Sequence, residues 1–80
     1  MKNQIAIQMD NIETIDYNFD TSFLIGFEAQ RRNYEIFYYN PNDLIIKNDN
    51  VQANGYYLKL NLDQNNYFEY TSEKKIVDLK

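Results

Sequence analysis

The sequence lacks several residue types on which common chemistries depend. Among 80 residues there is no cysteine, no histidine and no tryptophan, and there are only two glycines and one proline. Without cysteine there is no disulfide, no thiolate nucleophile and no thiolate metal site. Without histidine there is no imidazole general base, and therefore no Ser-His-Asp triad and no zincin motif. Only carboxylate and carbonyl oxygens are left as metal ligands, and these suit hard ions such as magnesium.

Long hydrophobic runs are also missing. No apolar stretch reaches the roughly 18 residues of a transmembrane helix, and the first residues contain no apolar signal-peptide core with a small-residue cleavage site. The net charge is -4 at pH 7, which argues against a protein that binds the phosphate backbone of nucleic acids. We therefore expect a cytoplasmic protein that binds neither a membrane nor a nucleic acid.

Aromatic and apolar residues are present in the amounts that a folded domain needs. Hydrophobic residues make up 44% of the chain, and eight tyrosines and five phenylalanines argue against disorder. A chain of this length forms one small domain at most.

The first 40 residues predict a strand, a loop, a helix and a second strand. The apolar run near 4–9 is typical of a buried strand in a covered sheet. A polar loop with apolar anchors follows it, and an apolar helical face then predicts a helix near 21–32. A second apolar run predicts a strand near 34–39. This order is a βαβ unit, which requires the two strands to be parallel.

Three positions of the predicted helix carry specific expectations. Gly26 costs roughly 1 kcal/mol relative to Ala in a helix interior, and a close approach of the helix to a strand would explain it. Asn33 stands where a left-handed residue ends a helix. Arg31 and Arg32 lie in the last turn, where the helix dipole favours cations, and this explains them better than a phosphate site does.

The second half of the chain changes to an alternating pattern. We expect an antiparallel ribbon over about 44–70, with turns near 47–50 and 63–66 and an apolar pattern that restarts at 76–79. The alternation places Leu58, Leu60 and Leu62 on one face. An aromatic cluster in this region could stack nucleobases, but packing within the sheet is the better interpretation for an acidic chain; it consists of Tyr56, Tyr57, Tyr67, Phe68 and Tyr70.

The best candidate site lies between the first strand and the helix. Ligands of open α/β sheets bind beyond the carboxyl ends of the strands, where Asp10 and Asn11 stand. Asp20, Thr21 and Ser22 open the helix, whose backbone N–H groups can hold a carboxylate or phosphate. The alternative is purely local, with Asp10 capping a turn and Asp20 or Thr21 capping the helix. The connection contains no glycine, which disfavours a dinucleotide fingerprint or a P-loop.

Five segments of the chain form one ordered pattern, and they are Ile5–Asp10, Ile12–Ile15, Asp20–Phe23, Glu28–Arg32 and Tyr34–Tyr39. Taken in this order, they resemble the N-terminus of bacterial glutathione synthetase. Two departures stand out, since Asn11 replaces a usual Pro and Asn33 a usual Gly, and Asn suits both geometries.

The resemblance implies an α/β fold, namely an incomplete Rossmann-like (pre-ATP-grasp) N-terminal domain over residues 1–80, with one βαβ unit and an antiparallel β ribbon. The family joins γ-glutamylcysteine to glycine with ATP and Mg²⁺, and the ATP-grasp domain that binds them is absent here. We therefore expect an N-terminal fragment of this ligase of glutathione biosynthesis, inactive alone. Its partner would be the remainder of the synthetase, in a homo-oligomer.

On this interpretation no residue of the chain is catalytic, none binds metal, and no cofactor is held. The expected substrate-binding residues are Asp10, Asn11, Asp20, Thr21 and Ser22. The main alternative is a free-standing, non-catalytic binding or interaction module with the same fold. A generic βαβ nucleotide-binding module is a third hypothesis, which the lack of glycines disfavours.

Overall fold

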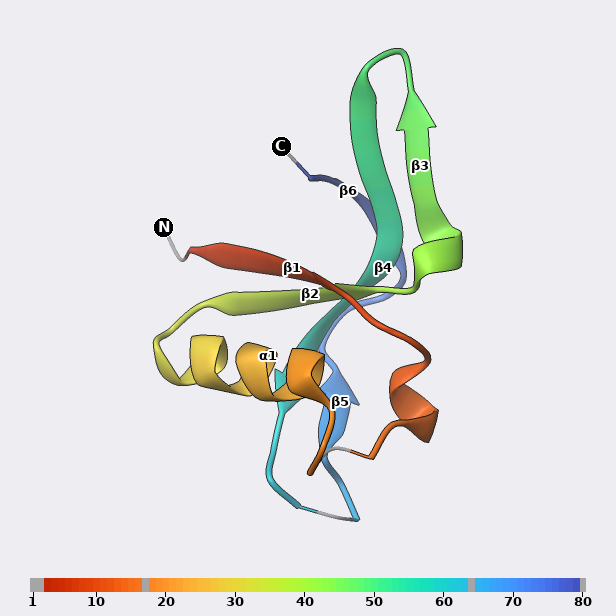
Figure 1. Ribbon diagram of the computed structural model, residues 1–80. Coiled ribbons are helices and arrows are strands. Elements are labelled where there is room, and N and C mark those ends of the chain that lie inside the picture. Colours follow the sequence, from red (N-terminus) through yellow and green to blue (C-terminus); the bar gives the residue numbers. More distant parts are fainter. Residues whose placement is uncertain (1–2, 17, 64, 80) are drawn as a thin grey trace.

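The computed structural model describes residues 3–16, 18–63 and 65–79 (Figure 1). These residues form a mixed sheet with one α-helix against it. The elements in chain order are β1 (Gln4–Gln8), η1 (Ile12–Thr14), α1 (Thr21–Arg31), β2 (Glu35–Tyr39), η2 (Pro41–Asp43), β3 (Leu44–Lys47), β4 (Asn50–Leu60), β5 (Phe68–Tyr70) and β6 (Lys75–Asp78).

The sheet is organised around β4. Strands β1 and β2 are parallel, with Ile5 opposite Ile36, which confirms the predicted βαβ unit. Strand β4 pairs antiparallel with β2, β3, β5 and β6. The antiparallel ribbon is therefore confirmed, and the apolar pattern at 76–79 contributes β6, which adds to β4. The β3–β4 hairpin extends away from α1, with the strands joined at its tip (Figure 1).

Helix α1 begins and ends where its capping residues are. The Asp20 carboxylate accepts a hydrogen bond from the Phe23 N–H at 2.8 Å, which pairs an amide that the helix itself leaves unbonded. Asn33 has φ 72°, and the N–H groups of Asn33 and Tyr34 donate to the carbonyls of Gln30 and Ala29. This is a Schellman ending, and it confirms the left-handed role predicted for Asn33.

The main core lies between α1 and the sheet. Gly26 allows the close approach that the sequence predicted, because a Cβ at this position would lie 2.8 Å from Cδ1 of Ile7 and 3.1 Å from Cδ1 of Leu60. The buried residues of this core are Ile7, Met9, Ile12, Phe23, Ile36, Tyr38, Leu58 and Leu60.

Two expectations about burial are wrong. Strand β1 is not buried on both faces. Within the described part of the chain it pairs only with β2, Ile7 is buried, and its neighbours Ala6 and Gln8 are exposed. Leu62 does not share the buried face of Leu58 and Leu60, because β4 ends at Leu60 and the side chain of Leu62 is 58% exposed.

A smaller apolar cluster forms on the face opposite α1. Phe37 is buried there, with its ring 5.2 Å from the ring of Tyr57 in an edge-to-face arrangement. Gly55 brings β2 and β4 together, because a Cβ at this position would overlap the carbonyl oxygen of Tyr38. The hairpin between β3 and β4 turns through Asn48 and Asp49, both with positive φ, as a two-residue type I′ turn requires.

Candidate functional site

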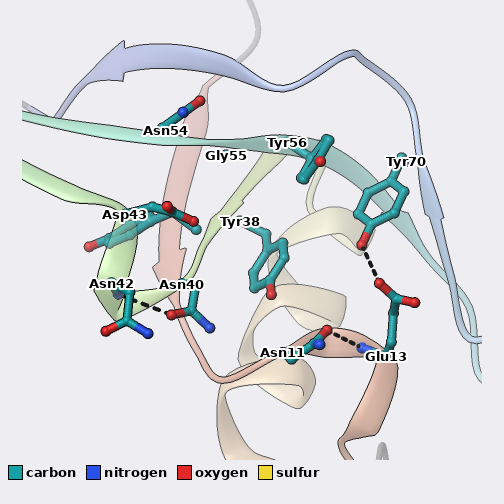
Figure 2. Close-up of a pocket in the computed structure, with 11 residues that line it drawn as sticks. Asn11, Glu13, Tyr38, Asn40, Asn42, Asp43, Asn54, Gly55, Tyr56 and Tyr70 are labelled. Carbon is teal, nitrogen blue, oxygen red and sulfur yellow. Dashed lines mark hydrogen bonds between the residues drawn. The ribbon is translucent and has the colours of Figure 1, made fainter.

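A cavity of about 350 Å³ opens at the carboxyl ends of β1 and β2 (Figure 2). Parallel strands end at the same edge of a sheet, so the segments that follow β1 and β2 meet here. The antiparallel strands β4 and β5 close the opposite side. The cavity is lined by Asn11, Glu13, Tyr38, Tyr39, Asn40, Asn42, Asp43, Asn54, Gly55, Tyr56 and Tyr70.

Tyrosine hydroxyls fix the segment that follows β1. The Tyr38 hydroxyl accepts a hydrogen bond from the Ile12 N–H at 3.2 Å, and the Tyr67 hydroxyl donates to the Ile12 carbonyl at 2.6 Å. The Ile12 side chain is itself fully buried in the core. Ile12 is thus held by its side chain and by both backbone groups, so the neighbouring residues Asn11 and Glu13 have defined positions at the cavity wall.

Glu13 and Tyr70 form a polar contact across the cavity (Figure 2). The Tyr70 hydroxyl donates to a Glu13 carboxylate oxygen at 3.4 Å. Burial raises the pKa of Tyr70 to about 12, and the negative charge of Glu13 acts in the same direction. Burial also raises the pKa of Tyr67. Both hydroxyls therefore stay protonated donors across the physiological range.

The structure brings one of the five predicted substrate-binding residues to this cavity. Asn11 lines it, and its side chain also caps η1 by accepting the Glu13 N–H at 3.0 Å. Asp10 is exposed just before it, and Asp20 caps α1. Thr21 and Ser22 form the first turn of α1. The capping alternative is confirmed for Asp20, while contact with a substrate stays a prediction for all five residues.

Other lining residues were not anticipated. Asn40 and Asp43 follow β2 as Asn11 follows β1, so the parallel pairing alone could have indicated them. No local signal indicates Asn54 and Tyr70, because the antiparallel pairing of distant segments brings them to the cavity.

The predicted packing role of the aromatic cluster is supported by the ring contacts. The rings of Tyr56 and Tyr70 lie 4.3 Å apart, and the rings of Phe68 and Tyr70 lie 5.3 Å apart. Tyr67 packs against Phe23 of α1 at 5.9 Å. Tyr56, Phe68 and Tyr70 therefore contact one another across β4 and β5. Tyr57 packs against Phe37 on the other face of the sheet.

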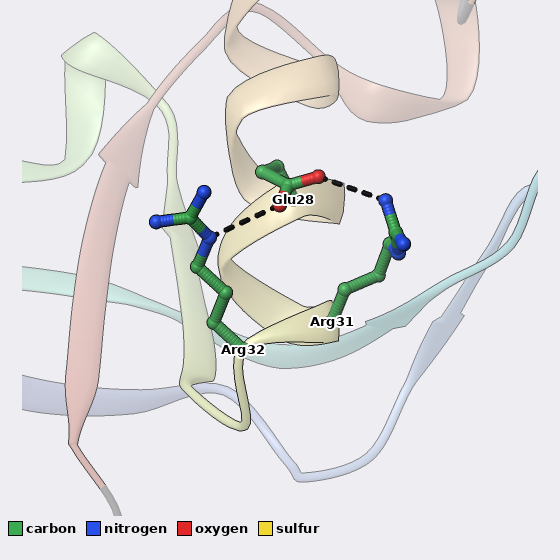
Figure 3. A network of polar contacts seen from close by, with 3 residues as sticks. All are labelled: Glu28, Arg31 and Arg32. Carbon is green, nitrogen blue, oxygen red and sulfur yellow. Dashed lines mark hydrogen bonds and ion pairs between the residues drawn. The ribbon is translucent and has the colours of Figure 1, made fainter.

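The two arginines are engaged within the helix (Figure 3). Glu28 accepts a hydrogen bond from Arg31 at 3.0 Å and one from Arg32 at 3.1 Å. The hydrogen bond from Arg32 and the charge of Arg31 hold the pKa of Glu28 below its usual range. All three groups are exposed. This arrangement fits helix-terminal charge better than a phosphate site.

No group of three or more histidine, cysteine, aspartate or glutamate side chains that could hold a metal ion occurs in the described part of the chain. Within the same residues, no helix is long and apolar enough to cross a membrane.

Comparison with known proteins identifies the family of this chain. The profile of the N-terminal domain of prokaryotic glutathione synthetase matches residues 3–80. The chain belongs to this family. The resemblance noted in the sequence is thereby confirmed over nearly the whole chain, together with the α/β fold class.

Curated relatives agree with this assignment. The glutathione synthetase of Buchnera aphidicola subsp. Schizaphis graminum is 38% identical over 73 residues, which cover 91% of this chain and 23% of the relative. The glutathione synthetase of Mesorhizobium japonicum is 45% identical over 53 residues, or 66% of this chain and 17% of the relative. That of Vibrio vulnificus strain YJ016 is 38% identical over 76 residues, or 95% and 24%. The chain spans about a quarter of the length of the relatives it matches.

Proposed function

We propose that this chain serves as the N-terminal part of a glutathione synthetase, the ATP-dependent ligase that joins γ-glutamylcysteine to glycine in glutathione biosynthesis. The family match over residues 3–80 carries the proposal. The relatives are glutathione synthetases, and this chain corresponds to one quarter of them.

This part would form one side of the substrate site and support the fold of the synthetase. It would not carry out the ligase reaction. The cavity at the strand ends, with Asn11 and Glu13 fixed at its wall, would form one side of the peptide-substrate site. The other predicted residues, Asp10, Asp20, Thr21 and Ser22, do not line this cavity. A contact of theirs with the substrate is proposed only from their positions after β1 and at the start of α1. None of these residues would form or break a bond.

The ATP and magnesium that the family implies do not fit the described residues. Residues 3–16, 18–63 and 65–79 contain no group of three or more histidine, cysteine, aspartate or glutamate side chains that could hold a metal, and the strand–helix connection has no glycine-rich loop for phosphates. We therefore assign ATP, magnesium and the ATP-grasp domain to the remainder of the synthetase, the proposed partner of this chain in a cytoplasmic homo-oligomer.

A chimeric synthetase tests the proposal. The segment of the Vibrio vulnificus enzyme that matches this chain is replaced by residues 3–80, and the gene is expressed in a bacterium that lacks its own glutathione synthetase. We expect restored glutathione, measured in cell extracts, while a matched enzyme with the segment deleted restores none. A chimera that accumulates as folded protein and makes no glutathione would contradict the proposal.

The chain by itself should be inactive. With γ-glutamylcysteine, glycine, ATP and Mg²⁺, a coupled assay on the purified 80-residue chain should show ADP release at the background rate. ADP formation that depends on both γ-glutamylcysteine and glycine would contradict this. It would show that the chain catalyses a reaction that we assign to the remainder of the synthetase.

A further inference from the structure

Among the described residues that line the cavity at the strand ends, the charged side chains are all carboxylates. Carboxylate and amide side chains contribute its polar groups, from Glu13 and Asp43 and from several asparagines. None of the described residues that line it is lysine or arginine. An anion placed here would face carboxylates without a lining cation, whereas a cation would find acceptors on more than one side.

The negative charge of Glu13 is not neutralised by its partner in the cavity. That partner is the Tyr70 hydroxyl at 3.4 Å, which stays uncharged. Asp43 lies 3.6 Å from the ammonium of Lys74, in a pair whose side chains are about 35% and 43% exposed. A pair so open to water is weakly held, so the carboxylate of Asp43 can accept from a ligand too.

Aromatic rings complete the wall. Tyr56 and Tyr70 pack with ring centroids 4.3 Å apart, and Tyr38 stands beside them (Figure 2). The face of an aromatic ring attracts a cation, an ammonium group included. The volume of about 350 Å³ is at the lower end of the range for sites that take small molecules.

We propose that this cavity binds a primary ammonium group, with Glu13 as the residue that accepts its charge-assisted hydrogen bond. The proposal deepens the proposed function and rests on it for the source of the ligand, since γ-glutamylcysteine and glycine both carry an ammonium group. The Asn11 side-chain oxygen already accepts the Glu13 N–H, and that of Asn40 accepts the Asn42 N–H. Each of these oxygens has a second lone pair that can accept one of the remaining N–H donors.

Amide NMR spectra of the ¹⁵N-labelled 80-residue chain test the assignment. The probes are glycinamide, which carries an ammonium group and no carboxylate, and acetamide, its uncharged counterpart. We expect glycinamide to shift the signals of Asn11, Glu13, Asn40 and Tyr56, with acetamide leaving them in place. Glycine and γ-glutamylcysteine, titrated separately, identify which source of ammonium binds more tightly.

Two substitutions separate the effect of the Glu13 charge from the effect of the net charge of the chain. Glu13→Gln keeps the shape of the side chain and should weaken glycinamide binding roughly tenfold or more, the effect of losing one charge-assisted hydrogen bond. Glu73→Gln changes the same charge at an exposed position outside the cavity and should leave binding unchanged. Dispersed amide signals in both variants show that each is folded.

Three results would overturn the proposal. These are cavity signals that glycinamide leaves in place, whether or not MgCl₂ shifts them, equal shifts with acetamide, and unchanged glycinamide binding in Glu13→Gln. The outcome is separable from that of the proposed function. A chimera that makes glutathione while glycinamide fails to bind overturns the ammonium site alone, and glycinamide binding with an inactive chimera overturns the synthetase role alone.

Discussion

The two halves of the molecule are held together by different kinds of contact. In residues 4–39, two parallel strands are joined through α1, and the helix boundaries are fixed by neighbours in the chain such as Asp20 and Asn33. In residues 44–78 there is no α-helix among the described residues, and strands gather around β4 by antiparallel pairing. Residues of the first half make up most of the buried core, and Leu58 and Leu60 of β4 complete it.

This difference shows how the site is built. Asn11 and Asn40 come from loops at the ends of the parallel strands, while Asn54 and Tyr70 come from the antiparallel half. The cavity therefore exists only where the halves meet, and β4 carries the contact between them. Substitutions in β4 should therefore affect both halves.

The largest effect is expected at Gly55, where the halves meet most closely. In Gly55→Ala the new methyl group overlaps a backbone carbonyl, that of Tyr38, which cannot rotate away. We expect the free energy of unfolding to fall by about 3 kcal/mol or more, measured by urea denaturation.

Gly26→Ala is the control for this prediction. Its methyl group would come closest to the ends of the flexible side chains of Ile7 and Leu60, and alanine adds about 1 kcal/mol of helix propensity. The loss should therefore be clearly smaller than that at Gly55. Equal losses would show that the contact between β2 and β4 is not the tighter one.

The next largest effect concerns the core end of β4. Leu60→Ala removes a side chain that is 1% exposed and lies in the main core, and should cost about 2–5 kcal/mol. Leu62→Ala, two residues further along, should cost less than about 0.5 kcal/mol because Leu62 lies on the surface. Thermal unfolding of both variants provides the comparison, and similar losses would mean that β4 extends to Leu62.

A smaller effect is expected from the polar contact between α1 and β4. The Gln30 amide accepts the Leu60 N–H at 2.8 Å and donates to the Leu60 carbonyl at 2.8 Å. Gln30→Met keeps the length but leaves both backbone groups without this partner, and should cost about 1–3 kcal/mol.

Gln52→Met serves as the control, because Gln52 bonds Asp78 on the exposed surface. Its cost should be near zero. If the two variants unfold at the same urea concentration, the helix is attached to β4 by apolar packing alone.

The smallest effect is a pH dependence confined to the first half. The folded pKa of Glu28 is lowered, so its pairs with Arg31 and Arg32 stabilise α1 fully above the ordinary carboxyl pKa. This stabilisation is lost as the pH falls through the lowered folded value. Glu28→Gln should flatten the acid limb of the stability–pH profile slightly, as measured by helix circular dichroism. A steeper acid limb in Glu28→Gln would give the opposite sign and contradict the pairing.

The sequence predicts the first half well because its determinants are local. The cap at Asp20, the ending at Asn33 and the close approach at Gly26 each follow from one residue and its neighbours. The extent of burial in β1 was not predictable in this way, since it depends on which segment covers each face. The end of β4 at Leu60 also depends on distant pairing, because Leu60 lies opposite Phe68, where β5 begins.

The residues of the candidate site also divide into those that the sequence can predict and those that it cannot. Asn11 could be found because it directly follows a strand, and the position of Asn40 after the parallel partner was available by the same reasoning. Asn54, Tyr56 and Tyr70 could not be found, because their places at the cavity depend on the pairing of β4 with β2 and β5. The hydroxyl bonds to Ile12 join residues 26 and 55 positions apart, so no local pattern reveals them.

The most direct test of the account is the rate of ADP release by the purified chimera that carries residues 3–80 in place of the matching segment of the Vibrio vulnificus enzyme. The account predicts ADP release that requires both γ-glutamylcysteine and glycine and that clearly exceeds the rate of the segment-deleted enzyme. A folded chimera whose ADP release does not rise when both substrates are supplied would contradict it.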